Sequence, residues 1–302
     1  MNIPNLGFLF NKHYYINEKL EFELKDIHKK NRDILKVEFK GRYNAPYGKY
    51  CFRLKTIYPG MIIGIGYQHD INNDDKKDNK DKEDKDCYKM GFYFDYTTGM
   101  PIIPGSTVKG LLRSAFKHRE YILEILKNNK IDFEKEKLEK FKKNLEDNGK
   151  ENYINYNLSD DDLLVNLLEY EIFEIGTIEG LKDIFYEAYI HEVKGNDGKF
   201  LADDYITPHY NNPLKNPIPL KFIKILPDVV FKFSFDLNDG ILNSFDKLKL
   251  FRQILLDLGI GAKTNVGYGK FDEKYGENDI LNLERRMKKN HKKYYKDFRR
   301  SI

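Results

Sequence analysis

The residues of this 302-residue chain that could bind an anion are concentrated in two short segments. The first segment, at residues 98–116, reads TGMPIIPGSTVKGLLRSAF. Its Pro-Gly step predicts a turn, and the residues after it predict a helix over 106–118 with Ser106 or Thr107 as the N-cap. Apolar residues at helical spacing would bury one face of this helix.

The other face of this helix carries a row of cations at four-residue intervals. The row consists of Lys109, Arg113 and Lys117. Free backbone N–H groups and the helix dipole at the helix start, with cations alongside, would bind a phosphate group. The alternative is a solvated basic face behind an ordinary cap, and this helix taken alone does not exclude it.

The second segment, at residues 258–270, reads LGIGAKTNVGYGK and places four glycines around a Lys-Thr-Asn centre. It resembles a nucleotide-binding P-loop only superficially, because Ala262 stands where that loop needs glycine. A helix precedes the glycines and a strand is expected after them, which reverses the P-loop order. Such a loop suits a polymer backbone lying across it, whereas a plain glycine cap and turn would explain only Gly259. The candidate contacts are Gly261, Lys263, Thr264, Asn265 and Tyr268.

The elements that would position these two segments follow one another as two β-α-β units. Strands are expected over 53–67, 184–190, 230–237 and 266–271, and helices over 106–118 and 245–258. Apart from a short strand at 92–96, the order is β-α-β-β-α-β, which predicts an α+β fold with a ferredoxin-like, RRM-type core. Two helices would cover one face of an antiparallel sheet, and the open face and nearby loops are where such folds meet RNA.

Three further segments differ from this core in composition. Residues 70–86 hold eight acids and five lysines and predict a disordered loop. Residues 119–170 predict a helical insert, with an amphipathic helix over 132–147 and a helix start at Ser159 before three aspartates. Residues 284–302 form a basic tail with nine Lys/Arg and two acids. The rest of the chain, residues 1–283, is expected to be a single domain.

Overall charge and cysteine usage exclude several classes of site. The 52 Lys/Arg and 48 Asp/Glu leave a net charge of only +4, which taken alone neither indicates nor excludes nucleic acid. Cys51 and Cys87 are the only cysteines, which excludes a four-cysteine zinc site and a disulfide framework. We expect a cytoplasmic chain without a signal peptide or membrane span, and no metal or cofactor.

The two anion-binding segments together resemble the hallmarks of the RAMP superfamily of CRISPR proteins. The helix-start motif is present as GMPIIPGSTVKGLLR, and the C-terminal glycine-rich loop as GIGAKTNVGYG. Further segments are similar to the sixth-subunit family of the type III-B (Cmr) effector complex: NLGFLFNK at 5–12, IFYEAY at 184–189, DYITPHY at 204–210 and NPIPL at 216–220. The similar positions extend from residue 5 to residue 271.

This resemblance implies a non-catalytic role in binding RNA and building an assembly for antiviral defence. Such a subunit would cap the far end of the Cmr filament near the 3′ part of the guide RNA. Its partners would be guide RNA, target RNA, a backbone RAMP subunit and other Cmr subunits, with no membrane. Residues 192–228 would form a thumb that wedges into the guide–target duplex, with His209 and Tyr210 among the RNA contacts.

Two alternatives to this role stay open. A RAMP endoribonuclease that processes guide RNA or cleaves target RNA would need an acid, a base or a metal beside the 2′-OH. Its candidates are the paired acids Asp203 and Asp204, His209, and His191 as the nearest second histidine. Solvated acids and a structural histidine account for the same residues. The other alternative is a free-standing RNA-binding protein, which would be a well-behaved monomer with RNA affinity of its own.

Overall fold

The computed structural model describes residues 4–16, 26–66, 69, 87–131, 133, 135–207 and 219–289. The predicted disordered loop at 70–86, the end of the basic tail, and the predicted RNA contacts His209 and Tyr210 lie outside the described residues.

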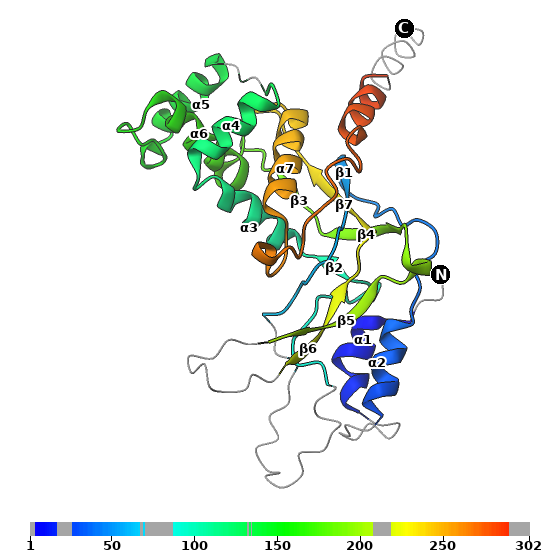
Figure 1. Cartoon of the computed structure of the whole chain (residues 1–302). Helices are drawn as coiled ribbons and strands as arrows, with labels where there is room; N and C mark the ends of the chain where they lie inside the picture. The colour runs from blue at the N-terminus through cyan, green and yellow to red at the C-terminus, as the bar shows by residue number, and fades with distance from the viewer. Residues whose placement is uncertain are drawn as a thin grey trace, which may run out of the picture.

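An antiparallel sheet forms the centre of the fold (Figure 1). Its strands run in the order β1-β7-β4-β2, and β3 also pairs with β7. An isolated bridge between Thr56 and Phe271 extends the pairing beyond β1. The strands are β1 (Tyr50–Lys55), β2 (Ile102–Ile103), β3 (Ile184–Phe185), β4 (Ala188–Val193) and β7 (Val229–Asp236).

The alternating sequence of β7 determines which face of the sheet is buried. Phe231, Phe233 and Phe235 are at most 1% exposed and point into the core, where Phe233 stacks on Phe52 of β1 with ring centroids 5.6 Å apart. Lys232 lies between them and points to the opposite face, because successive strand residues face opposite sides. Aromatic packing therefore secures the inner face, and the outer face carries the polar residues.

Two helices cover the inner face, α3 (Gly105–Ala115) and α7 (Ser244–Leu258). In α7 the side chain of Asn243 caps the first turn by accepting from the Asp246 N–H, and the helix ends at Gly259. In α3 the N-cap is Pro104, which makes no side-chain cap. The expectation that Ser106 or Thr107 caps this helix is therefore wrong, because both already lie inside it.

The insert after α3 is helical over most of its length. It contains α4 (Arg119–Asn128), α5 (Lys135–Asp147) and α6 (Asp160–Tyr170), and a π-helical turn at Glu171–Ile175 follows. The amphipathic pattern at 132–147 is confirmed, since Phe141 and Leu145 are the buried residues of α5. Ser159 caps α6 through its hydroxyl, which accepts from the Asp162 N–H.

A two-stranded hairpin, β5 (Leu201–Ile206) and β6 (Leu220–Ile225), projects from the sheet beside two N-terminal helices (Figure 1). These helices, α1 (Leu6–Asn11) and α2 (Ile27–Leu35), have no counterpart among the predicted elements. Leu6, Phe10, Ile27 and Ile34 bury their apolar side chains in the common core.

Three predicted strands differ from the structure. The first strand occupies 50–55 rather than 53–67, because the chain turns at Pro59 and Gly60 and afterwards makes only a bridge at Met61. The segment at 92–96 contributes one bridge, at Phe94. The last strand, expected over 266–271, is reduced to the Phe271 bridge, since a 3-10 turn at Thr264–Val266 and further turns take its place.

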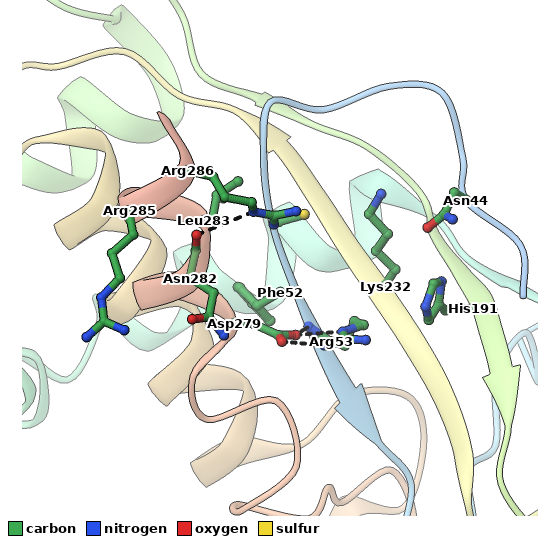
Figure 2. Close-up of a pocket in the computed structure, with 11 residues that line it drawn as sticks. Asn44, Phe52, Arg53, His191, Lys232, Asp279, Asn282, Leu283, Arg285 and Arg286 are labelled. Carbon is green, nitrogen blue, oxygen red and sulfur yellow. Dashed lines mark hydrogen bonds and ion pairs between the residues drawn. The ribbon is translucent and has the colours of Figure 1, made fainter. Parts of the chain in front are cut away.

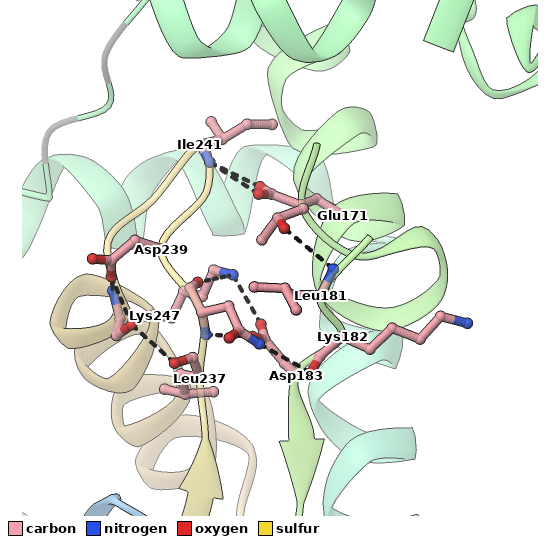
Figure 3. Close-up of polar contacts among 11 residues, drawn as sticks. Glu171, Leu181, Lys182, Asp183, Leu237, Asp239, Ile241 and Lys247 are labelled. Atoms are coloured by element: carbon pink, nitrogen blue, oxygen red, sulfur yellow. Dashed lines mark hydrogen bonds and ion pairs between the residues drawn. The ribbon is translucent and has the colours of Figure 1, made fainter. Parts of the chain in front are cut away.

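A buried ion pair joins α7 to the chain entering β3 (Figure 3). Lys247 Nζ lies 2.9 Å from Asp183 Oδ2, and both side chains are 1% exposed. Lys247 also donates to the Asn238 carbonyl, and Asp183 accepts from the Asn238 N–H. Glu171, which is 2% exposed, accepts the Ile241 N–H with both carboxylate oxygens at 3.0 Å. These bonds hold the helical insert against the connection between β7 and α7.

Residues 279–289 form a final helix that lies over part of the outer face of the sheet. Asp279 secures its first turn by pairing with Arg53 of β1 at 2.5 Å. The predicted basic tail therefore begins inside a helix rather than after the folded part. Within the described residues, no helix combines the length and hydropathy needed to cross a membrane.

Candidate nucleic-acid interface

The glycine-rich loop after α7 is held by backbone hydrogen bonds to residues 60–62. Ala262 N–H donates to the Ile62 carbonyl at 2.9 Å, and Gly269 N–H donates to the Gly60 carbonyl at 2.8 Å. Gly261 has φ +98°, and a Cβ there would lie 2.3 Å from the Ile62 carbonyl oxygen. The close approach that glycine permits at Gly261 is thus to the backbone of this chain, not to the ligand that the sequence suggested.

The tip of this loop presents polar side chains to solvent. Lys263 adopts the left-handed conformation with φ 57° and starts the turn of Thr264, Asn265 and Val266. Lys263 and Asn265 are exposed, and their side chains make no hydrogen bond or ion pair to any other described residue. They therefore remain available to a phosphate backbone, as predicted for an RNA contact.

Tyr268 connects the same loop to the hairpin. Its hydroxyl donates to Asp204 Oδ2 at 2.7 Å, and Lys224 of β6 reaches the same oxygen at 2.7 Å. Burial raises the pKa of Asp204, but the bonds from Lys224 and Tyr268 outweigh this effect and leave its pKa below the usual value. The ring of Tyr268 also lies edge-on to Phe222, with centroids 6.4 Å apart. Half-buried Tyr268 thus joins the two elements.

Residues 57–63 lie between the glycine-rich loop and the hairpin and are hydrogen-bonded to both. Met61 exchanges two backbone hydrogen bonds with Ile225 of β6, at 2.9 and 2.8 Å. Two residues before Gly60, the Tyr58 side chain is 83% exposed, and Pro59 lies near the turn at Gly267, where an added Cβ would be 3.4 Å from its Cδ. An exposed tyrosine on the same surface as the exposed Lys263 can stack on a base.

Sequence reasoning missed Tyr58, Tyr205 and Lys224 as parts of this surface. Tyr205 is 55% exposed and lies opposite Lys221 in the hairpin, with the Lys221 ammonium 6.0 Å from its ring. The Tyr-Pro-Gly step at 58–60 was a usable signal, because an aromatic residue at such a turn seldom finds a core to enter. Nothing in the sequence places Lys224 against Tyr268.

The first turn of α3 lies toward the same end of the sheet as the glycine loop in Figure 1. Ser106 and Lys117 are exposed, Thr107 is half-buried, and Lys109 lies 5.7 Å from the ring centroid of Phe185. Arg113 differs from the other members of the predicted cationic row. It pairs with Glu169 of α6 at 2.9 Å and with Glu174 of the following π-helical turn at 2.7 Å, which commits its guanidinium to protein contacts.

The candidate catalytic residues are not brought together within the described structure. Asp203 and Asp204 lie on β5 rather than on a loop, and each is paired with a lysine of β6, Lys221 and Lys224 respectively. Tyr88 also donates its hydroxyl to Asp203. His191 belongs to β4 in the other sheet, and its Nδ1 lies 2.7 Å from the Tyr43 carbonyl. In the described ranges, no cluster of three or more His, Cys, Asp or Glu side chains could hold a metal ion.

Two solved structures show similarity to this chain. One is described as the cryo-EM structure of the type III-B Cmr-β complex bound to cognate target RNA; it is 21% identical, with a TM-score of 0.43, over 74% of this chain and 57% of that chain. The other, Cmr6 from Pyrococcus furiosus, is 20% identical with a TM-score of 0.39, over 74% of this chain and 95% of that one.

No curated protein matches the sequence. The family model of the RAMP superfamily matches residues 53–272. That range runs from β1 to the end of the glycine-rich loop and includes every element of the surface described above. The chain is a member of the RAMP superfamily.

Proposed function

We propose that this chain is an RNA-binding, non-catalytic subunit of a type III-B CRISPR (Cmr) effector complex. The observation that carries the proposal is the single surface formed by the glycine-rich loop, residues 57–63 and the hairpin β5–β6. That surface presents exposed Lys263, Asn265 and Tyr58 beside a backbone scaffold closed by hydrogen bonds. A cation for the phosphates and an aromatic ring for the bases are the combination that binds single-stranded RNA.

The order of the secondary-structure elements supports a ferredoxin-like core for this subunit. The four core strands in chain order are β1, β4, β7 and the bridge at Phe271. Across the sheet they lie in the order Phe271, β1, β7 and β4, that is, fourth, first, third and second. The pairs β1–β7 and β4–β7 are antiparallel, as that fold requires. The strands of the hairpin then lie within the proposed thumb at 192–228, which would meet the duplex of guide and target RNA.

The absence of catalysis is part of the proposal. Its support is that both hairpin carboxylates are engaged by lysines and that His191 lies on a strand of the other sheet. We further propose that the guide RNA and neighbouring Cmr subunits, among them a backbone RAMP subunit, are the partners, in the cytoplasm, near the 3′ part of the guide. The endoribonuclease alternative predicts that Asp204→Asn or His209→Ala abolishes RNA cleavage by the assembled complex, whereas our proposal predicts that cleavage persists.

Lys263→Gln tests the RNA surface directly. Loss of one phosphate contact should weaken binding to every RNA sequence and reduce the slope of log K against log salt by about 0.7 for single-stranded RNA. The measurement is fluorescence polarisation with labelled single-stranded RNA across a salt series. Lys143→Gln, an exposed lysine of α5, is the matched control. An unchanged slope for Lys263→Gln would show that this lysine is merely solvated.

A further inference from the structure

A cavity of about 820 Å³ lies on the outer face of the sheet, next to the helix at 279–289 (Figure 2). It shares no residue with the glycine-rich loop, the hairpin or α3. Its lining comes from β1, β7, β4, one loop and the final helix, and includes Cys51, Arg53, Lys232, His191, Asn44 and Arg286. Its volume lies within the range of small-molecule sites.

The charge in this cavity is cationic and only partly neutralised. Arg53 is satisfied by Asp279, to which it donates from Nε at 2.8 Å as well as from its terminal nitrogen. The ammonium group of Lys232 has no hydrogen bond or ion pair to any residue in the described part of the chain. Arg286 donates only its Nε, to the Asn282 carbonyl at 3.3 Å, and in Figure 2 its guanidinium reaches back toward β1. Lys232 and Arg286 therefore offer unused donors to an anion.

His191 adds an acceptor to these donors. Its Nδ1 lies 2.7 Å from the Tyr43 carbonyl, which can only accept, so Nδ1 carries the proton. Burial lowers the pKa of His191, and the nearby cations Arg53 and Lys232 act in the same direction, although the Tyr43 bond and Glu192 oppose them. The ring is thus neutral at pH 7, and its Nε2 is free to accept a hydrogen bond from a hydroxyl or amine.

We propose that this cavity binds one phosphate-bearing nucleotide, with the phosphate between Lys232 and Arg286 and a ribose hydroxyl or base N–H donated to His191 Nε2. Guanidinium and ammonium groups together are the usual phosphate ligands in proteins. The inference rests on the proposed function only in taking RNA as the source of the nucleotide. A free nucleotide is the other source of the same chemistry, and the experiment separates the two.

Cys51 reports on the cavity directly, because it lines the cavity while Cys87 is buried elsewhere in the core. We would follow alkylation of Cys51 in the full chain by iodoacetamide with mass spectrometry, at mildly alkaline pH because burial raises the pKa of this thiol. The probes are a short oligouridylate and uridine monophosphate. At about ten times its Kd, a ligand in the cavity should slow alkylation about tenfold. Protection by the oligouridylate alone identifies RNA as the source, and protection by both identifies a free-nucleotide site.

The Lys232→Gln/Arg286→Gln variant should lose this protection. Both cations lower the pKa of the Cys51 thiol, so alkylation without ligand should be slower than in the wild type, and protection is therefore measured in each variant as the ratio of the rates without and with ligand. The control Lys127→Gln/Lys143→Gln removes two exposed lysines of the insert and should keep the protection. Lys263→Gln should weaken total RNA binding but keep protection of Cys51 at saturating RNA. The two proposals therefore fail separately.

Three results would overturn the inference. The first is that neither probe protects Cys51. The second is that protection survives in Lys232→Gln/Arg286→Gln or disappears in Lys263→Gln at saturating RNA, since the contact would then lie elsewhere. The third is that polyglutamate protects Cys51 as well as the oligouridylate does, which would make the cavity a general acidic-peptide surface.

Discussion

The carboxylate of Asp204 accepts hydrogen bonds from Lys224 and Tyr268, which lie 20 and 64 positions away in the sequence. Its neighbour Asp203 faces the other side of the strand and pairs with Lys221. Adjacent acids in a sequence suggest a shared site, but successive residues of a strand point to opposite faces. The pair therefore serves two separate contacts, and neither carboxylate is left to act as an unengaged base.

Tyr58 provides a test at the level of one side chain. Tyr58→Ala should weaken single-stranded RNA binding by about five- to 150-fold, because stacking on one base is worth about 1–3 kcal/mol. Tyr58→Phe should retain most of the affinity, since the ring rather than the hydroxyl makes the contact. Polarisation measurements with a labelled oligonucleotide give both values.

Tyr96→Ala is the matched control for this test, because Tyr96 is 93% exposed but belongs to the turn after the Phe94 bridge. Equal losses for Tyr58→Ala and Tyr96→Ala would mean that exposed tyrosines contribute nonspecifically.

At the scale of elements, α3 is joined to the helical insert through Arg113. Arg113→Gln should lower the free energy of unfolding by about 1 kcal/mol, since both ion pairs are partly exposed. It should leave the salt dependence of RNA binding unchanged, because the guanidinium faces Glu169 and Glu174. Urea unfolding and a salt series measure the two quantities, and a reduced salt slope would restore Arg113 to the RNA surface as first predicted.

Breaking the buried pair of Lys247 and Asp183 should cost more stability than the loss of Arg113. Lys247→Met should destabilise the chain by about 3–5 kcal/mol, because it leaves the Asp183 carboxylate buried without its counter-charge. Lys247→Met/Asp183→Leu should recover most of that loss. Lys249→Met is the control, since Lys249 of the same helix pairs with Asp246 and keeps its side chain 33% exposed. If the double variant were no more stable than the single one, an unpaired Asp183 carboxylate would not be the cause of the loss.

Elements with regular apolar spacing could be predicted from the sequence, and elements defined by distant partners could not. The Phe alternation at 230–237 and the stripe at 245–258 gave β7 and α7 to within one residue at each end. The segment at 266–271 has strand-like residues, yet its glycines take positive φ and close the loop onto residues 60–62. In the candidate site, Lys263 could be found from its place between the glycines of the loop, and Tyr58 had the turn signal at 58–60. Lys224 joins the site only through tertiary packing.

For the molecule as a whole, Glu171 makes stability depend on pH. Burial raises its pKa from 4.5 to about 7, although Lys247 and the Ile241 N–H oppose that rise. The folded chain therefore holds a proton that the unfolded chain has released between these two pH values. The free energy of unfolding should fall as the pH rises through this window, by about 3 kcal/mol in total, and then level off.

Glu171→Gln should remove this dependence, because the amide keeps an acceptor for the Ile241 N–H without a titrating proton. Urea unfolding at a series of pH values compares it with the wild type and with Glu139→Gln, an exposed residue of α5. Parallel pH curves for wild type and Glu171→Gln would show that another group carries the dependence.

Residues 57–63 affect how many nucleotides of RNA this surface would cover. Their backbone is bonded on one side to the glycine-rich loop and on the other to β6. These main-chain bonds hold the glycine-rich loop and β6 to the same short segment, so the distance between Lys263 and the hairpin is fixed before RNA binds. We therefore expect this surface to cover the same number of nucleotides whatever their sequence. We also expect little ordering of the protein when RNA binds.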